Sequence, residues 1–284
     1  MGRGNPLIRR MNNDAQRTDH AYAGQPQQGQ YGQNRYGQPQ GDPQQQAPSA
    51  ASLNQMYNAP AATSADMQRA TMDDVVVKTL SMLGLIAVGG AVGWFLGGIS
   101  ALFGIIGFVL AMVVIFKRKT SPALVMAYAV CEGLFLGGIS RIFESQFGGI
   151  VLMAVVSTLV VFLGMLALYA KAGVRISGKT AKVLAIGMVA YLVFIVGNLI
   201  FGAFTGSSMR DFTIFGIPVG IIIGLLAVIM ACACLIQDFQ QIDGALRAGV
   251  PQKESWRLAF GLIVTLVWLY VEILRLLSYF MPRN

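Results

Sequence analysis

The chain has 284 residues, of which 55% are hydrophobic and only 12% charged, and its formal net charge is +8. Because a soluble domain carries about a quarter charged residues, this composition excludes an ordinary soluble protein. Almost all apolar residues lie after residue 75, which predicts an integral membrane protein with a polar N-terminal tail. The only histidine, His20, lies in that tail, and Cys131, Cys232 and Cys234 form no CxxC pair. We therefore expect neither a zinc site nor a disulfide framework.

The N-terminal tail, residues 1–70, is rich in Gln, Gly, Pro, Ala and Asn and has no apolar periodicity. This composition predicts a disordered tail. Order is expected to begin at Thr71, because Thr71-Met72-Asp73-Asp74 has the pattern of a helix N-cap followed by an acid three residues later. Residues 71–284 are predicted to form a single transmembrane domain.

Seven apolar spans follow, each close to the roughly 20 residues that a helix needs to cross a bilayer core. They cover about 79–96, 99–116, 121–143, 150–170, 183–204, 214–236 and 258–280. Only Gly97 and Gly98 separate the first two spans, so the glycine pair is expected to form a tight turn. Lys and Arg gather in alternate loops, and the positive-inside rule then predicts a multi-pass protein with its N-terminus inside and its C-terminus outside.

Small residues recur at four-residue spacing in the first and sixth spans, and such faces let helix backbones approach closely. The two sets are Gly89, Gly93 and Gly97, and Gly216, Gly220 and Gly224. We expect both to serve packing within the molecule rather than a dimer interface.

The last apolar stretch, Trp256–Phe280, carries Glu272 and Arg275 well inside its span. A polar and aromatic stripe shares one face of this helix, because its members recur every three or four residues. The stripe consists of Gly261, Thr265, Trp268, Glu272, Arg275 and Tyr279. A membrane helix with such a stripe does not face lipid all round. We therefore predict an all-α membrane fold of seven helices with the seventh at the centre.

Only three charged side chains lie well inside the spans, namely Glu132, Glu272 and Arg275, and Asp238 lies just past the inner end of the sixth span. A charge at membrane depth costs several kcal/mol, so each is a candidate functional residue. Glu272 and Arg275 lie one helical turn apart. Two interpretations of that pair stand equal: a structural ion pair, or part of a functional site.

The depths of the acids suggest a pairing. At a rise of about 1.5 Å per residue, Glu132 lies about 16 Å from the inner end of its span and Glu272 about 18 Å from the inner face, with Asp238 at the inner mouth. Two carboxylates in a dehydrated pocket cannot both ionise cheaply, so one keeps its proton until the pH rises or a cation arrives. This predicts a pH-gated cation site, and Ca²⁺ is the candidate ion because it prefers carboxylate oxygens.

Enzymatic chemistry has no support in the sequence, which shows no phosphate-binding loop and no nucleophile paired with a base. We predict that the protein is not an enzyme and has no cofactor, apart from Ca²⁺ as a bound or permeating ion. The basic residues lie in short loops, where lipid headgroups rather than nucleic acid are the expected partners.

Four stretches together resemble the Bax inhibitor-1 family, in particular its bacterial branch with long polar N-terminal tails. They are TMDDVVVKT (71–79), YAVCEGLFLGGIS (128–140), QDFQQID (237–243) and WLYVEILRLLSYF (268–280). The resemblance covers about residues 71–280. It implies seven helices with the last in the middle of the other six, and a location in the bacterial plasma membrane with the tail in the cytoplasm. Some family members are pH-sensitive calcium leak channels.

The resemblance also implies a gate made of two aspartates, one near the end of helix six and one in helix seven. Asp238 and Glu272 match these positions, with a glutamate as the second acid, and would hold Ca²⁺. The family's basic cluster after helix two, which can latch the helix-six aspartate, resembles Lys117-Arg118-Lys119. The depths above place Asp238 and Glu272 too far apart to share a proton, which makes Glu132 the better-placed partner of Glu272.

Three functions follow from these observations. The first is a pH-sensitive cation leak that uses Asp238, Glu272 and Glu132, with Arg275 beside them. The second is a regulatory membrane protein that binds other membrane proteins, for example a quality-control protease, as some bacterial relatives do. The third, a proton-coupled transporter, is weaker because no inverted repeat is visible between the spans.

Overall fold

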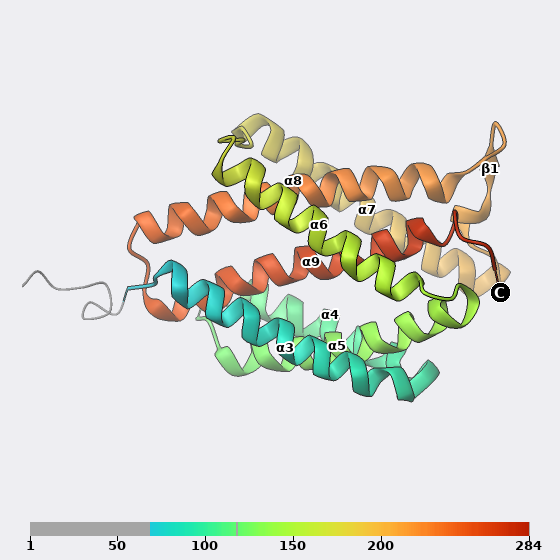
Figure 1. The fold of residues 1–284 in the computed structure, drawn as a ribbon, viewed down its shortest axis with the longest axis horizontal. Helices are drawn as coiled ribbons and strands as arrows, with labels where there is room; N and C mark the ends of the chain where they lie inside the picture. Colours follow the sequence, from blue (N-terminus) through green and yellow to red (C-terminus); the bar gives the residue numbers. More distant parts are fainter. Residues whose placement is uncertain (1–68, 118, 284) are drawn as a thin grey trace, which may run out of the picture. The chain divides into compact units, whose positions relative to one another are not determined.

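A computed structural model describes residues 69–117 and 119–283 (Figure 1). The predicted disordered tail, up to residue 68, lies outside the described residues. The helices are α3 (Met72–Leu96), α4 (Ser100–Phe116), α5 (Pro122–Gln146), α6 (Ile150–Ala170), α7 (Gly178–Thr205), α8 (Val219–Arg247) and α9 (Ser255–Leu277). Short 3-10 turns cover Gly97–Ile99 (η1), Met209–Asp211 (η2) and Gln252–Glu254 (η3), and β1 (Thr213–Ile214) pairs with β2 (Ile217–Pro218).

The described part of the chain contains six helical stretches that are long and apolar enough to cross a membrane. The first of them, Met72–Phe116, includes α3, η1 and α4. Large apolar side chains cover the outside of the bundle: Phe95 is 81%, Leu199 72% and Phe204 87% exposed. Such a surface suits contact with lipid chains, and the predicted all-α membrane class is confirmed.

The start of α3 is the predicted capping box. The backbone N–H of Asp74 donates to Thr71 Oγ1 at 3.2 Å, and the backbone N–H of Thr71 donates to Asp74 Oδ2 at 3.0 Å. Each partner satisfies a backbone donor that the first turn of a helix leaves free.

Arg69 and Ala70, which the sequence assigned to the tail, belong to the described structure. Arg69 forms an isolated antiparallel bridge with Pro251, and the Ala70 N–H donates to the Val250 carbonyl at 2.8 Å. The end of the predicted tail is therefore attached to the segment that joins α8 to α9.

Gly89 and Gly93 bring α3 against α5, as their spacing predicted, whereas Gly97, the third member of the predicted face, lies outside α3 in η1. A Cβ placed on Gly89 would lie 3.0 Å from the carbonyl oxygen of Val130, and one on Gly93 would overlap the carbonyl oxygen of Leu134. Only glycine permits this backbone-to-backbone approach. These glycines thus serve contacts within the molecule.

Helix α4 also packs on α5, but it runs antiparallel to α5, whereas α3 runs parallel to it. Its Gly104 lies beside Phe135, and its Gly107 lies beside Glu132, one turn earlier on α5. The chain therefore reverses at η1, where Gly97 takes a φ of 60° that favours glycine. This is the tight turn that the glycine pair predicted.

Helix α8 differs from its prediction at both ends. It begins at Val219 rather than 214 and continues to Arg247, well past 236. Gly216 lies in the turn of the β1–β2 hairpin with a φ of 80°, so the predicted helical face of three glycines is wrong at its first member. Gly220 and Gly224 do lie on one face, where they contact Tyr279 and Leu276.

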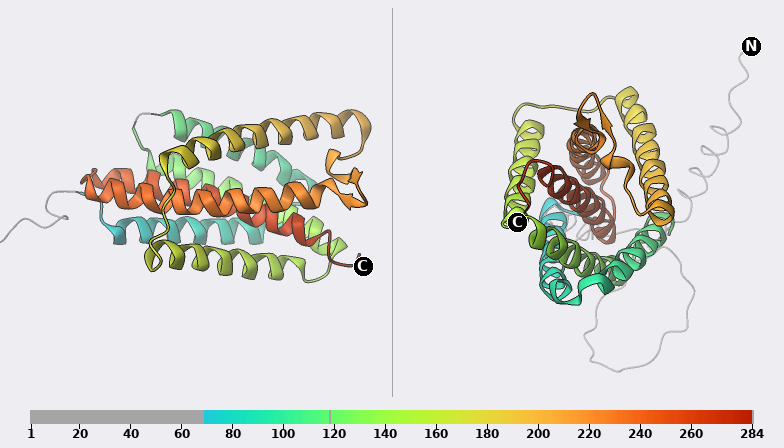
Figure 2. Two further views of the ribbon diagram at one scale, coloured as in Figure 1. Left: turned by 90° about the horizontal axis from the view of Figure 1, so that it is seen from above. Right: turned by 90° about the vertical axis from the view of Figure 1, so that its right-hand side faces the viewer.

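Helix α9 lies among the other helices, as both views in Figure 2 show. It packs against α3, α5, α6 and α8, and eleven of its 23 residues are buried, from Ser255 to Leu274. In contrast, α7 has a single buried residue, Leu184. The polar stripe of α9 therefore meets other parts of the protein and not lipid, as its pattern predicted.

Candidate functional site

Glu272 of α9 is the centre of a buried polar cluster and is only 1% exposed. The Tyr191 hydroxyl of α7 donates a short hydrogen bond to Oε1 of Glu272. Arg210 Nη1 lies 3.3 Å from Oε2, and Arg275 Nη1 lies 3.5 Å from Oε1. One carboxylate is thus shared by two guanidinium groups and a phenol.

Arg210 reaches this cluster from η2, in the segment between α7 and α8, and is 3% exposed. Its Nη2 donates to the Tyr191 hydroxyl at 2.7 Å. Burial acts to lower the pKa of Arg210, but the Glu272 carboxylate and the Tyr191 hydroxyl outweigh it and hold this pKa above its ordinary value. The guanidinium is therefore charged, and the buried Glu272 has a full cation as its partner.

Asn198 of α7 fixes the backbone that carries Arg210. Its Oδ1 accepts from the Met209 N–H at 2.8 Å and from Ser208 Oγ at 3.1 Å. The Asp211 carboxylate caps the same turn by accepting from the Ser208 N–H at 3.3 Å. These bonds hold the turn that carries Arg210 against α7.

Asp238 of α8 has a different environment. It is partly buried, and its Oδ2 accepts a 2.6 Å hydrogen bond from the hydroxyl of Thr265 on α9. Within residues 69–117 and 119–283, Asp238 forms no salt bridge. It lies nine residues before Arg247, about 13 Å from the end of α8 by the helical rise. Asp238 therefore lies within α8, because the helix continues beyond the apolar run that ends near residue 236.

The carboxyl groups of Asp238 and Glu272 lie at different levels of the bundle. Asp238 meets α9 at Thr265, and Glu272 is seven residues further on, about 10 Å along the helix. The side chain that faces Asp238 from α9 is therefore a threonine and not a second acid.

Glu132 also lies away from Glu272, because α5 and α9 run parallel in a fixed register. Tyr128 packs edge-on against Phe260 at 5.0 Å between ring centroids, and Ser140 shares a 2.7 Å hydrogen bond with Tyr270. Interpolation between these contacts puts Glu132 about 13 Å short of Glu272 along α9. The predicted common level of the two glutamates is wrong.

The carboxylate of Glu132 is directed toward α4. Its Oε2 lies 2.9 Å from the place where a Cβ on Gly107 would be. The absence of a side chain on Gly107 therefore makes room for the acid between α4 and α5. The predicted site residues fall into three separate places: Glu272 with Arg275, Asp238 with Thr265, and Glu132 beside Gly107.

Comparison with known families identifies the chain. A family model described as Bax inhibitor 1 like matches residues 5–282. The chain belongs to the Bax inhibitor-1-like family. A search of the curated proteins found no match. The resemblance predicted from four sequence stretches is confirmed, and membership agrees with the apolar helices that the structure shows.

In this Bax inhibitor-1-like chain, the implied latch between the basic cluster and Asp238 is not formed by the described residues. Lys117 and Lys119 are both exposed, and neither has a salt bridge to Asp238 within the described ranges. The side chain of Arg118 lies outside the described part. Asp238 consequently has Thr265 as its partner here.

Sequence reasoning missed two residues of the Glu272 cluster in this Bax inhibitor-1-like protein. In the sequence, Arg210 was interpreted as a loop residue whose charge the neighbouring Asp211 cancels. Residue spacing within a loop does not indicate that the loop folds back onto a distant helix. Tyr191 did leave a signal, because it is a hydroxyl-bearing residue in the middle of an apolar span. A buried hydroxyl needs a partner, and that need points to a polar group on a neighbouring helix.

Proposed function

We propose that this protein is a non-enzymatic cation leak pathway in the bacterial plasma membrane, with Ca²⁺ as the first candidate ion and Asp238 as its controlling residue. One observation carries the proposal: a carboxylate well inside α8 has a hydroxyl partner, Thr265, and no salt bridge to any described residue. A carboxylate that is partly buried and has no cationic partner is costly when ionised, so a proton or a bound cation would compensate it. Ca²⁺ prefers oxygen ligands of this kind.

The Glu272 cluster has the opposite role in this proposal. Its carboxylate is already neutralised by Arg210 and Arg275 and joins α7, α9 and the η2 turn. A cation that passes Asp238 would meet these two guanidinium groups next. The pathway is therefore closed at this level, and opening requires α7 to move away from α9, which separates Tyr191 from Glu272.

The expected pH dependence follows from the charge of Asp238. The ionised carboxylate attracts a cation, and the protonated form does not. Flux is therefore expected to fall as the pH falls and Asp238 takes up a proton. Glu132, between α4 and α5, likewise has no salt bridge to any described residue, but it lies on a different pair of helices.

We further propose that α3 and α4 cross the membrane separately, which gives seven crossings. The alternation of Lys and Arg between loops then places the N-terminus in the cytoplasm and the C-terminus outside. In this orientation the Glu272 cluster lies toward the outer face, and the α8–α9 connection lies toward the cytoplasm.

The test is Ca²⁺ flux into liposomes that hold a Ca²⁺ dye, from about pH 6 to about pH 8, a range in which buried carboxyls titrate. Wild-type flux is expected to rise with pH, and Asp238→Asn to give a low flux that does not change with pH. The matched control is Asp243→Asn, which changes an aspartate of the same helix that is 33% exposed and paired with Arg247. It should behave as wild type. Absence of flux at every pH, or an unchanged profile in Asp238→Asn, contradicts the proposal.

The second function predicted from the sequence, binding to other membrane proteins through the tail, stays a prediction. Crosslinking followed by pull-down, with and without residues 1–70, tests it. Recovery of the same partners by both forms would show that the tail is not the binding segment.

A further inference from the structure

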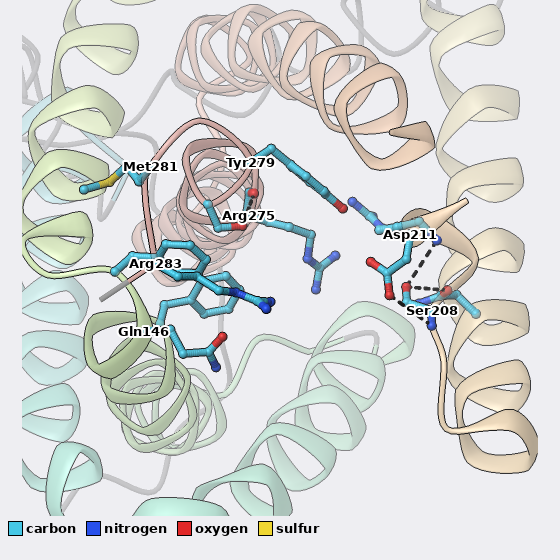
Figure 3. Close-up of a pocket in the computed structure, with 12 residues that line it drawn as sticks. Gln146, Ser208, Asp211, Arg275, Tyr279, Met281 and Arg283 are labelled. Atoms are coloured by element: carbon cyan, nitrogen blue, oxygen red, sulfur yellow. Dashed lines mark hydrogen bonds between the residues drawn. The ribbon is translucent and has the colours of Figure 1, made fainter. Parts of the chain in front are cut away.

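A pocket of about 480 Å³ lies beside the Glu272 cluster (Figure 3). Its walls come from the end of α5, from α7, from the η2 turn and from the end of α9 with the residues that follow. The volume falls within the roughly 300–1,000 Å³ of small-ligand sites. The pocket shares Arg210 and Arg275 with the Glu272 cluster, but the leak proposal gives the cavity itself no role.

The lining of the pocket has an excess of positive charge. It includes Arg210, Arg275 and Arg283 but a single acid, Asp211. Glu272 behind the wall compensates Arg210 and is only 3.5 Å from one nitrogen of Arg275. Three guanidinium groups therefore stand against two carboxylates.

Two of these arginines have capacity for a ligand. The guanidinium groups of Arg275 and Arg283 both point into the pocket (Figure 3). Arg275 is 32% exposed, and Arg283 lies 5.9 Å from the Phe147 ring and has no salt bridge to any described residue. Each guanidinium carries five N–H donors in a planar fork.

Arg210 adds a buried donor without a partner. Its two Nη atoms bond to Glu272 and Tyr191, but its Nε is buried and has no hydrogen-bond partner in the described part of the chain. A buried donor of this kind normally has a partner, and in a ligand pocket the ligand or an ordered water supplies it. Arg210 itself is 97% buried, since only 3% of it is exposed.

Tyr279 completes the donor set. Burial raises the pKa of its phenol, so this hydroxyl stays neutral and available as a donor. The lining also includes the apolar residues Phe143, Phe147 and Met281, and Arg283 lies over the Phe147 ring. The pocket therefore combines anion-binding donors with an apolar wall.

We propose that this pocket binds a phosphate group between Arg275 and Arg283. Guanidinium forks match the oxygens of a phosphate in bidentate geometry, and the resulting bonds are charge-assisted. Phosphate is the anionic group that lipid headgroups present in quantity at the end of a membrane bundle. The source is either a phospholipid headgroup, whose chains lie along the apolar wall, or free phosphate.

The test is a titration of the purified full chain in an uncharged, phosphate-free detergent, followed by calorimetry. Two probes are used separately: inorganic phosphate and a short-chain phosphatidylglycerol. Saturable binding of either probe is expected. Arg283→Gln should weaken binding about tenfold, because it removes a charge-assisted contact at an exposed position that does not hold the fold together.

The matched control is Arg141→Gln. Arg141 is an exposed arginine at the same end of α5, and it contacts the Trp94 carbonyl at 3.0 Å outside the pocket. Its substitution should leave the affinity unchanged. Asp211→Asn is a second control in which the affinity should change in the opposite direction. It removes the negative charge of the pocket but keeps an oxygen for the Ser208 cap. It should strengthen binding about threefold, within the range of a single partly screened charge.

Binding of the lipid alone identifies a headgroup as the source, and binding of inorganic phosphate, alone or together with the lipid, identifies the phosphate group itself. Either outcome supports the proposal. Absence of saturable binding for both probes, or equal affinities of Arg283→Gln and Arg141→Gln, overturns it. Because the titration involves no ion flux, failure of the leak proposal and failure of this one are distinct results.

Discussion

At the scale of single residues, the same functional group has two fates in this bundle. The Glu272 carboxylate is held by Arg210, Arg275 and Tyr191, whereas the Asp238 carboxylate has the Thr265 hydroxyl. A buried charge with well-placed partners is a structural element, and one that lacks a cation is a candidate for binding a proton or an ion. For this reason we assign closure of the proposed ion pathway to the Glu272 cluster and its pH control to Asp238.

Substitution of Arg210 tests the structural role of the Glu272 cluster. Arg210→Met leaves the buried Glu272 with Arg275 as its only cation and Tyr191 as a neutral partner, and removing one partner of a buried pair costs about 3 kcal/mol. We expect a clear drop in the melting temperature of the detergent-solubilised protein. The control Arg247→Met breaks a surface pair with Asp243 in which Arg247 is 77% exposed, and should cost no more than about 0.5 kcal/mol. Equal melting temperatures for the two variants would contradict a structural role for Arg210.

At the scale of elements, the apolar runs predicted the helices better than their ends. The span 150–170 matches α6, and the capping pattern at Thr71 fixes the start of α3. Helix α8 was predicted too short because roughly its last three turns, after residue 236, are polar and amphipathic and so fall outside an apolar run.

The contact of α3 with α5 can be tested at one glycine. A Cβ on Gly93 would overlap the Leu134 carbonyl, so Gly93→Ala forces the helices apart and should cost about 1–3 kcal/mol, seen as a lower melting temperature. Gly84 lies on the same helix with no atom within 4 Å of its virtual Cβ. Gly84→Ala should therefore stabilise α3 by up to about 1 kcal/mol. Similar effects of the two substitutions would show that the close approach does not matter.

At the scale of the whole molecule, the family and the place of α9 were predictable, but the partners of its charges were not. The polar stripe on α9 showed that this helix does not face lipid all round. The stripe recurs every three or four residues, so it can be recognised from the sequence alone. The partner of Glu272 comes from a loop, Arg210, and the partner of Asp238 is set by the register of α8 on α9. Both depend on tertiary packing, which local periodicity does not encode. The same reason explains why Glu132 was assigned to the wrong level.

The proposed orientation of the molecule is testable by labelling of introduced cysteines. In a background that lacks the three native cysteines, Ser207→Cys reports the α7–α8 segment and Ala172→Cys the α6–α7 segment, and both positions are exposed. A membrane-impermeant maleimide added to intact cells should label Ser207→Cys and leave Ala172→Cys unlabelled until the membrane is permeabilised. The reverse pattern would show that the charge rule gives the wrong orientation.

The bridge between Arg69 and Pro251 has a mechanical consequence. Residues 69 and 70 are fastened to Pro251 and Val250, immediately before the start of α9, and Lys78 of α3 bonds to Ser255 at the first residue of that helix. A force applied to the chain before residue 69 would therefore act on the N-terminal end of α9 as well as on α3. A partner that binds the N-terminal segment could thereby shift α9, and with α9 the hydrogen bond between Thr265 and Asp238.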